Sequence, residues 1–379
     1  MVFYLGYYYT DPNVTKGANW SQSKKMDYII QSLNNENVDV HVLSCAYYGN
    51  SKHYFSRGFT TIIRPHFIFT KFPELKYKTI IGKAFGRLLL YVTLLLRLLR
   101  IKKEDTIIVY HSVIISEIVY YISKIKKIHI ITEVEEIYSL AFPDKYNSLD
   151  KEKRSLLAPD GFLFVNDLLH IYLNTKKPWT PVYGSYHSCR ETQYENIFND
   201  NKIHIVYAGS FSTHKGGVYH AVKAATLLGN QYEMHVLGYG DDKSINELNE
   251  LIDSINKSSC CKVHYHGMLS GNEYDSFLLS CNIGLNPQNS GKYMETAFPS
   301  KVLSYLSHGL NVVTTDLKSL AVSKVADLLV LTKEPEPKMI ADAIISINLK
   351  PKEAIFSRIE ELDKDFREDL LNMICTNPK

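Results

Sequence analysis

The sequence predicts an α/β protein with two doubly wound domains, each built on a parallel sheet. Short runs rich in β-branched and aromatic residues recur along the chain with helical segments between them, which is typical of parallel βαβ units. The 379 residues are enough for two domains of about 150 residues or more. The polar residues 181–202 interrupt the rhythm, so we place the linker between the domains there.

The first domain is expected to span residues 1–190. Its predicted strands lie at residues 2–9, 39–45, 106–112, 128–134 and 161–166. The N-terminal stretch MVFYLGYYYT lacks the basic start and apolar core of a signal peptide, so it indicates a first strand.

The second domain is expected to span residues 191–350 and repeats the same rhythm. Its predicted strands lie at residues 203–209, 232–240, 262–268, 282–287, 311–315 and 328–332. Between the first two of them, apolar residues recur at helical spacing: Val218, Ala221, Val222, Ala225 and Leu228. Residues 351–379 are helical in pattern, and we expect this helix to cross back to the first domain.

Composition and charge exclude several functions. The net charge of +3 is too small to indicate nucleic acid as the main partner. The six cysteines lack the paired spacing of a zinc site, which favours structural thiols in a reducing cytosol. No stretch reaches the roughly 18 uninterrupted apolar residues of a membrane-spanning helix. We therefore expect a protein that is soluble or lies on a membrane surface.

A loop of the second domain suits a bound phosphate. In VYAGSFSTHKGG, residues 206–217, a strand ends at Gly209, a loop of small and hydroxyl residues follows, and a helix begins. Free backbone N–H groups and Lys215 then point to one place, which is how proteins hold phosphate. The alternative is a glycine-rich turn that only reverses the chain.

A second loop leads to the same edge of the sheet. Residues 282–301, NIGLNPQNSGKYMETAFPSK, deliver Lys292, Ser300 and Lys301 to the C-terminal ends of the strands, where open α/β sheets bind ligands. Ser300 and Lys301 fall in the first turn of a predicted helix, whose N–H groups favour an anion. The alternative for Ser300 is a plain N-cap.

The order of these motifs resembles a known family. GSFSTHKGG, VLGYG, VHYHGMLSGNEYDSFLLSCNIGLNP and FPSKVLSYLSHGLNVVTT, within residues 203–315, are similar to the C-terminal domain of GT-B-fold glycosyltransferases of the family-4 type. The resemblance implies two Rossmann-like domains that face a cleft. It also implies a C-terminal domain that binds a nucleotide sugar, an N-terminal domain that binds the acceptor, no metal or other cofactor, and retention of anomeric configuration.

The resemblance also implies a set of donor-binding residues. They are Gly209, Ser210, Lys215, Glu295, Phe298, Ser300, Lys301 and Ser304. Lys215 falls where the family places a lysine on the diphosphate, although a solvated loop lysine is the alternative. Ser210 replaces a frequent arginine, and the family's paired glutamates fall on Thr296 and Ser304, so Glu295 is the nearest carboxylate that could substitute.

Candidate catalytic and acceptor-binding residues lie in the first domain. A carboxylate or histidine at a strand end could take the proton from an acceptor hydroxyl. The catalytic candidates are His111, Glu133, Glu135 and Glu136, and the acceptor-binding candidates are Gly17, Ala18 and Asn19. The alternatives are a structural histidine, a solvated acidic turn and a turn that caps a helix.

A basic and apolar segment indicates membrane contact. Residues 71–103 hold nine basic residues and a single acid, Glu74, around the run LLLYVTLLL. A helix with basic flanks would lie on anionic lipid, at the inner leaflet of the cytoplasmic membrane. The alternative is a buried helix of the first domain with basic ends.

Together these observations predict a cytoplasmic glycosyltransferase bound peripherally to the inner face of the membrane. By resemblance, it would transfer a sugar from a nucleoside diphosphate donor to a growing, lipid-linked glycan of a bacterial surface polysaccharide such as O-antigen or capsule. The alternatives are a non-catalytic partner that kept the fold and binds glycan, and a nucleotide-sugar epimerase.

Overall fold

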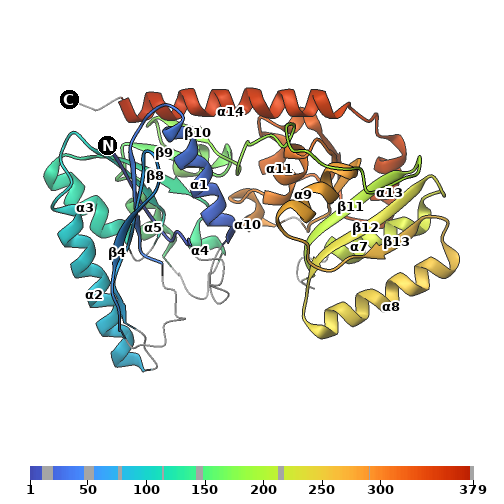
Figure 1. The fold of residues 1–379 in the computed structure, drawn as a ribbon, viewed down its shortest axis with the longest axis horizontal. Helices are drawn as coiled ribbons and strands as arrows, with labels where there is room; N and C mark the ends of the chain where they lie inside the picture. The colour runs from blue at the N-terminus through green and yellow to red at the C-terminus, as the bar shows by residue number, and fades with distance from the viewer. Residues whose placement is uncertain are drawn as a thin grey trace. The chain divides into compact units, whose positions relative to one another are not determined.

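The computed structural model describes residues 1–10, 20–46, 55–75, 79–112, 115–141, 148–211, 217–289 and 291–375. The chain divides into two compact units, the first comprising Met1–Ser185 with Asp365–Lys379 and the second Tyr186–Lys364 (Figure 1). Both units are α/β, as the strand rhythm predicts. Within the described residues, no helix is long and apolar enough to cross a membrane.

The first unit is built on an eight-stranded sheet. Its strands are β1 (Val2–Gly6), β2 (Val40–Ser44), β4 (Phe59–Arg64), β5 (Phe67–Lys71), β7 (Thr106–Tyr110), β8 (His129–Val134), β9 (Gly161–Phe164) and β10 (Trp179–Pro181). Their order is β10-β9-β8-β7-β1-β2-β5-β4, with β4 antiparallel to β5 and the other neighbours parallel. β3 (Phe55–Ser56) and β6 (Glu74–Leu75) form a separate pair. The five predicted strands are present as β1, β2, β7, β8 and β9, whereas β4, β5 and β10 were not predicted.

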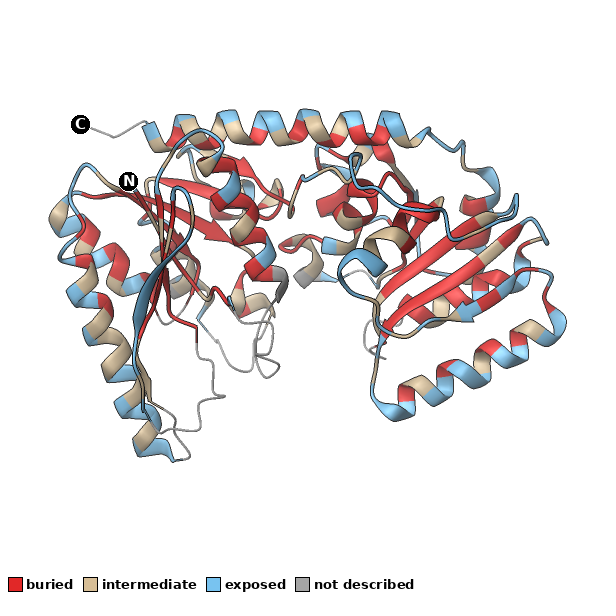
Figure 2. Cartoon of the chain, in the orientation of Figure 1, coloured by how far each residue is buried: buried red, intermediate tan, exposed pale blue. Residues whose placement is uncertain are grey.

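The helices of the first unit differ in how deeply they are buried. They are α1 (Trp20–Asn34), α2 (Ile80–Leu98), α3 (Ser116–Lys126), α4 (Tyr138–Ala141), α5 (Leu149–Leu156) and α6 (Leu168–Leu173). In α2 only Leu94 and Leu98 are buried, against a core that includes Leu5 and Val109. Figure 2 shows α2 as mainly exposed or intermediate along its length.

The second unit holds a six-stranded, fully parallel sheet. Its strands are β11 (Ile203–Ser210), β12 (Tyr232–Tyr239), β13 (Lys262–Tyr265), β14 (Ile283–Asn286), β15 (Asn311–Thr315) and β16 (Leu329–Thr332), in the order β13-β12-β11-β14-β15-β16. The helices are α7 (Gly217–Ala224), α8 (Asp242–Ser258), α9 (Gly271–Ser280), α10 (Lys292–Glu295), α11 (Ser300–Ser307), α12 (Lys318–Ala321) and α13 (Pro337–Ser346), with 3₁₀ turns at Ala225–Leu227 and Ala326–Leu328. All six predicted strands are present.

The core of the second unit confirms the predicted helical periodicity. All five apolar residues that recur after the first loop are buried in one cluster: Val218, Ala221, Val222, Ala225 and Leu228. The final helix, α14, spans Lys352–Cys375. Its last part belongs to the first unit, where Phe366 stacks on Tyr28 at 5.4 Å between ring centroids and Asp369 accepts a hydrogen bond from Thr180 at 2.8 Å.

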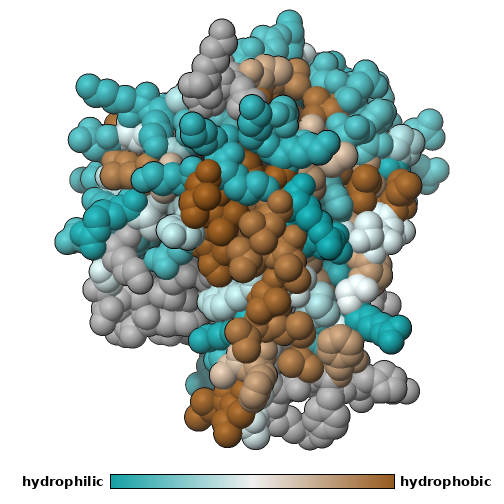
Figure 3. All heavy atoms as spheres, turned by 90° about the vertical axis from the view of Figure 1, so that its left-hand side faces the viewer, coloured by the Kyte–Doolittle hydropathy of each residue, from teal (hydrophilic) through white to brown (hydrophobic). Residues whose placement is uncertain are grey.

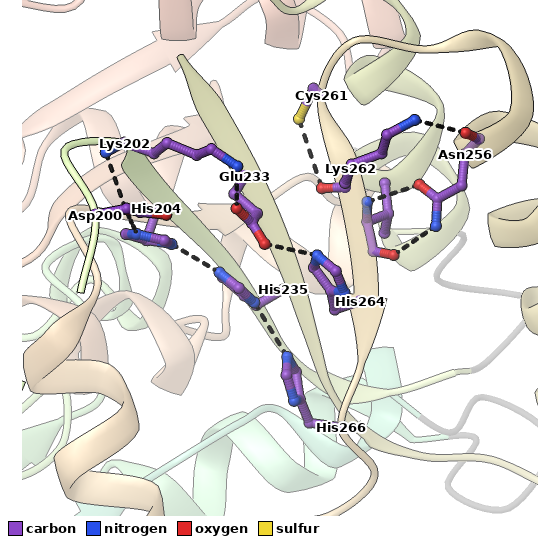
Figure 4. A network of polar contacts seen from close by, with 11 residues as sticks. Asp200, Lys202, His204, Glu233, His235, Asn256, Cys261, Lys262, His264 and His266 are labelled. Atoms are coloured by element: carbon purple, nitrogen blue, oxygen red, sulfur yellow. Dashed lines mark hydrogen bonds and ion pairs between the residues drawn. The ribbon is translucent and has the colours of Figure 1, made fainter. Parts of the chain in front are cut away.

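One face of strands β11 to β13 carries a row of histidines (Figure 4). Nε2 of His204 contacts Asp200 at 2.9 Å, Nδ1 of His204 contacts Nε2 of His235 at 2.9 Å, and Nδ1 of His235 contacts Nε2 of His266 at 3.0 Å. Because the Asp200 carboxylate only accepts, each neutral ring donates toward Asp200 and accepts from the next ring. A proton added to His235 would leave two N–H groups facing each other.

The pKa of His235 agrees with this direction of hydrogen bonding. Burial lowers the pKa of His235 to about 2, and the neighbouring histidines add to the effect. His264 lies beside the row and pairs with Glu233 at 2.6 Å. Phe198 stacks on His204 at 3.7 Å, which further shields the rings from water. His235 is therefore held neutral within a structural row of histidines in the sheet.

Candidate functional site

The strand order of the second unit reverses between β11 and β14, and ligands bind at such a point in open α/β sheets. The two strands pair only as far as Val206 and Gly284 and then diverge. Tyr305 of α11 fills the fork, because its hydroxyl accepts a hydrogen bond from the Ala208 N–H at 2.8 Å and donates to the Leu285 carbonyl at 3.3 Å. Sequence reasoning missed Tyr305, which has only the spacing of a core residue on a helix.

Two neighbouring strands carry glycines near their ends, and one of these glycines leaves room for a lysine. Gly209 has φ of 153° and Gly238, its partner on β12, has φ of 140°, so side chains would be strained at both positions. A β carbon at Gly209 would collide with Cε and Nζ of Lys301. Nζ of Lys301 also lies 4.1 Å from the centroid of the Tyr207 ring. The predicted residues Gly209 and Lys301 therefore meet at the C-terminal end of β11, with Ser210 directly after Gly209.

The helix that carries Lys301 begins beside this strand end. Pro299 occupies the N-cap position of α11 and no side chain caps the helix, so the alternative that Ser300 is the N-cap is wrong. Ser300 is instead the first helical residue, and it is exposed. The positive end of α11 and the Lys301 ammonium thus lie together at the switch point, where they suit a phosphate group.

The structure shows other contacts, or none, for the remaining predicted donor residues. Glu295 ends α10 and pairs with Lys318 at 2.7 Å. Ser304 Oγ lies 3.4 Å from the hydroxyl of Tyr274 on α9, and Phe298 is buried. Lys215 lies outside the described residues, as does most of its loop, and nothing is described of the Lys292 side chain. Donor contacts by these residues stay predictions.

Asn286 at the end of β14 is a residue that sequence reasoning missed. It is fully buried, and its Nδ2 donates to the hydroxyl of Thr314 at 2.9 Å. Its Oδ1 has no hydrogen-bond partner among the described residues. Because a buried unpaired acceptor destabilises a fold by about 1–3 kcal/mol, such an atom next to the switch point is a candidate to accept from a ligand.

In the first unit, Glu133 lies near the end of β8, and Glu135 and Glu136 follow that strand. Glu133 is completely buried; it accepts a hydrogen bond from the Tyr4 hydroxyl, and its Oε1 lies 3.9 Å from Nζ of Lys25. Burial and, to a smaller extent, the Glu135 carboxylate raise the pKa of Glu133 to about 8, against the opposing effect of Lys25. Lys25 is itself buried and also pairs with Glu135. Glu136 follows and is half-buried.

His111 follows β7 and is buried in a hydrogen-bonded cluster. Its Nε2 contacts Oε1 of Glu152 at 2.9 Å, and its Nδ1 has no partner among the described residues. Glu152 also accepts from the N–H groups of Tyr138 and Ser139, each at 2.8 Å. Burial by itself would raise the pKa of Glu152, but the hydrogen bonds from His111 and Ser139 outweigh it and lower this pKa.

The ends of β1 and β7 are joined by a hydrogen bond of 2.7 Å between the hydroxyls of Tyr7 and Ser112. The predicted acceptor-binding residues Gly17, Ala18 and Asn19 lie outside the described residues. No group of histidine, cysteine, aspartate or glutamate within the described part of the chain could hold a metal ion. The structure therefore brings His111, Glu133, Glu135 and Glu136 to one edge of the first sheet, while their catalytic roles stay predictions.

Comparison with protein families assigns the second unit. Residues 202–348 match the family model described as glycosyl transferases group 1. The matched residues contain β11 to β16 and the whole switch point. The chain is a glycosyltransferase. A search of curated proteins finds no matching sequence.

Solved glycosyltransferases share the fold along the whole chain. The trehalose-6-phosphate protein from E. coli bound with UDP-2-fluoro glucose superposes with a TM-score of 0.67, covering 99% of this chain and 98% of its own, at 10% identity. A UDP-forming trehalose-phosphate synthase from Burkholderia xenovorans, in complex with glucose-6-phosphate, gives a TM-score of 0.64 at 10% identity, over 98% of this chain and 100% of its own. At this identity the likeness shows the fold alone, and the predicted GT-B fold is confirmed.

Proposed function

We propose that this glycosyltransferase takes its sugar from a nucleoside diphosphate donor bound at the switch point of the second unit. One observation carries the proposal: Lys301 and the start of α11 lie together against Gly209 at the end of β11. The departing nucleoside diphosphate gains negative charge in the transition state, and a fixed ammonium with a helix N-terminus stabilises that charge. A UDP-sugar is the first donor to try, because the E. coli structure holds UDP-2-fluoro glucose.

The donor is tested by thermal shift with a panel of UDP-, GDP- and dTDP-sugars. A ligand at about 100 times its dissociation constant should add about 2.7 kcal/mol to the free energy of unfolding. The matched variants are Lys301→Ala and Lys333→Ala, because Lys333 is an exposed lysine of the same unit. The proposal fails if no nucleotide sugar shifts the wild type, or if both variants respond equally.

We propose a lipid-linked glycan at the inner face of the cytoplasmic membrane as the acceptor, within synthesis of a bacterial surface polysaccharide such as O-antigen or capsule. The supporting observation is the exposed apolar side of α2 in the first unit, next to basic residues. Transfer is measured with extracted lipid-linked glycans and the identified donor. Incubation of the donor alone separates this activity from an epimerase, which would convert the nucleotide sugar without an acceptor.

A soluble phosphosugar is the second candidate acceptor. The Burkholderia xenovorans structure contains glucose-6-phosphate, and its fold covers almost the whole of this chain. Glucose-6-phosphate and related phosphosugars therefore belong in the same assay. Turnover with these acceptors and none with lipid-linked glycans would replace the first candidate by the second.

We further propose that transfer retains the anomeric configuration and requires no metal or other cofactor, with a proton acceptor among His111, Glu133, Glu135 and Glu136. Retention is read from the anomeric coupling in the proton NMR spectrum of the product. Activity should be unchanged by EDTA. Loss of activity with EDTA that Mg²⁺ or Mn²⁺ restores would overturn the metal-independent mechanism.

A further inference from the structure

The outer side of α2 carries an exposed apolar stripe. Ile81, Phe85, Leu88, Val92 and Leu96 recur at helical spacing, and each is at least 47% exposed. Figure 3 views the side of the molecule where α2 lies and shows apolar side chains gathered in a band down this face. Large exposed apolar patches of this kind mark protein or membrane interaction sites.

A hollow of about 420 Å³ opens on one flank of the stripe. Its lining includes Leu96, which belongs to the stripe, and Phe59 from the start of β4. The polar part of the lining comes from Thr60, Lys71, Thr93, Arg97 and Arg100. The hollow thus joins an apolar edge to hydroxyl, ammonium and guanidinium donors.

The positive charge of the hollow is only partly compensated within the protein. Lys71 is buried and pairs with Glu74 at 3.4 Å. Arg97 and Arg100, in contrast, make no ion pair with any described residue. Burial lowers the pKa of the nearby His41, and the positive charge of Arg97 lowers it further. Residues 75–103 contain neither aspartate nor glutamate, so the segment that carries the two arginines holds no counter-charge for them.

We propose that this hollow binds the phosphate group of an anionic phospholipid while the apolar stripe of α2 enters the bilayer interface. The proposal rests on the membrane contact proposed above and identifies its binding site. A guanidinium offers a planar fork of donors that matches phosphate oxygens, and two such groups with threonine hydroxyls surround one anion. The volume suits a headgroup, and the acyl chains would continue along the stripe from Leu96.

Two other accounts make different predictions. Arg97 lies in the last turn of α2, where a cation also stabilises the helix dipole without any ligand. The apolar stripe could alternatively pack against a second copy of the chain. The first account leaves lipid binding unaffected by loss of the arginines, and the second gives a dimer in solution.

The test is flotation of the full-length protein with vesicles of phosphatidylcholine alone and of phosphatidylcholine mixed with phosphatidylglycerol. The pocket variant is Arg97→Gln with Arg100→Gln. The control is Lys102→Gln with Lys103→Gln, which removes the same charge from residues outside the lining. Loss of the general attraction of about 1 kcal/mol for each cation would lower the partition coefficient of either variant by at most about 30-fold, whereas the pocket variant also loses its hydrogen bonds to the phosphate, so we expect its partition coefficient to fall by a further factor of about 10 or more. Equal losses, or no loss, would overturn the proposal.

A second measurement separates lipid phosphate from free phosphate. Calorimetry with monomeric short-chain phosphatidylglycerol should show binding to the wild type and none to the pocket variant, whereas inorganic phosphate should bind far more weakly. Equal binding of inorganic phosphate would assign a free-anion site instead. A dimer in sedimentation that Phe85→Ser with Leu88→Ser dissociates, without any change in flotation, would assign the stripe to self-association.

The outcome is distinguishable from that of the proposed transfer reaction. Thermal shift by the nucleotide sugar reports on the second unit and needs no membrane, so the pocket variant should respond as the wild type does. If the donor binds but no vesicle binds, the lipid site is lost and the donor site stands. If vesicles bind through the hollow but no nucleotide sugar binds, the donor site is lost and the lipid site stands.

Discussion

The two sheets of this glycosyltransferase treat charged groups at their switch points in opposite ways. In the first unit the end of β8 carries Glu133, which is fully buried beside the buried Lys25, and His111 is hydrogen-bonded to Glu152. In the second unit Lys301 lies against a glycine and an aromatic ring at the start of a helix that no side chain caps. The first edge pairs its charged groups with one another, while the second brings an ammonium and a helix N-terminus together.

This difference indicates how each edge contributes to activity. Buried charges that pair with one another position the backbone and contribute to stability, and they leave few donors for a substrate. At the second switch point the Lys301 ammonium lies with the uncapped start of α11, and this arrangement suits an anion. We therefore expect substitution of Lys25 in the first cluster to act mainly on folding, and substitution of Lys301 at the second switch point to act mainly on donor affinity.

The largest expected effect comes from Lys25→Met. Because Glu133 holds a proton below about pH 8, this change leaves the Glu135 carboxylate as the charge without its cation, so the free energy of unfolding of the first unit at neutral pH should fall by about 3 kcal/mol. Both tryptophans, Trp20 and Trp179, lie in this unit, so tryptophan fluorescence during urea denaturation follows its unfolding. The control is Lys24→Met on the exposed side of α1. Equal stability of the two variants would contradict a stabilising role of the buried cluster.

The two units should also respond to acid in opposite directions. Because burial lowers the pKa of His235 to about 2, the unfolded chain binds a proton below about pH 6.5 that the folded row excludes. From pH 6.5 to 4.5 the second unit should therefore lose about 2 kcal/mol of stability. The raised pKa of Glu133 works the other way: the folded first unit holds a proton up to about pH 8 that the unfolded chain releases near pH 4.5, so stability is lost as the pH rises between them.

Hydrogen exchange of β11 to β13 peptides, measured by mass spectrometry, tests how the stability of the second unit changes with pH. Tryptophan fluorescence during urea denaturation tests the same for the first unit. The groups that face His235 are His204, His264 and His266, with Asp200 and Glu233 nearby. His235→Phe keeps an aromatic ring between Phe198 and Phe277 but cannot be protonated, so it should flatten the acid slope of the second unit alone. If the stability of the second unit still falls with acid in this variant, a group other than His235 causes the fall.

Lys301→Ala is expected to separate binding from stability. Hydrogen bonds to a charged group contribute about 1.5–3 kcal/mol, so donor affinity should fall roughly 10- to 150-fold while the thermal midpoint without ligand stays close to that of the wild type. Titration calorimetry with the identified nucleotide sugar measures the affinity, and Lys333→Ala is the matched control. A large loss of stability with unchanged donor affinity would show instead that Lys301 has a structural role.

The sequence predicts the second unit better than the first for a physical reason. Its inner strands β11, β14 and β15 are almost entirely buried, and the start of α11 is marked by the proline before Ser300 and Lys301. In the first unit β4 is exposed for most of its length and β10 has three residues, so neither shows a clear pattern. The glutamates within residues 133–136 favour a solvated turn when only the sequence is considered. The pairing of Glu133 with Tyr110 on β7 shows that Glu133 lies inside the sheet.

The smallest expected effect concerns Tyr305, whose role no local pattern reveals. Tyr305→Phe removes the hydroxyl that bridges β11 and β14, so the Ala208 N–H is left buried without a partner. The second unit should lose about 1–2 kcal/mol of stability. Tyr274→Phe is the control, because its hydroxyl makes only a 3.4 Å contact with Ser304. Since both tryptophans lie in the first unit, hydrogen exchange of β11 and β14 peptides is the measurement. Faster exchange in the Tyr305 variant, together with weaker donor binding, would show that the fork holds Gly209 and Lys301 in place; faster exchange with unchanged binding would limit Tyr305 to a structural role.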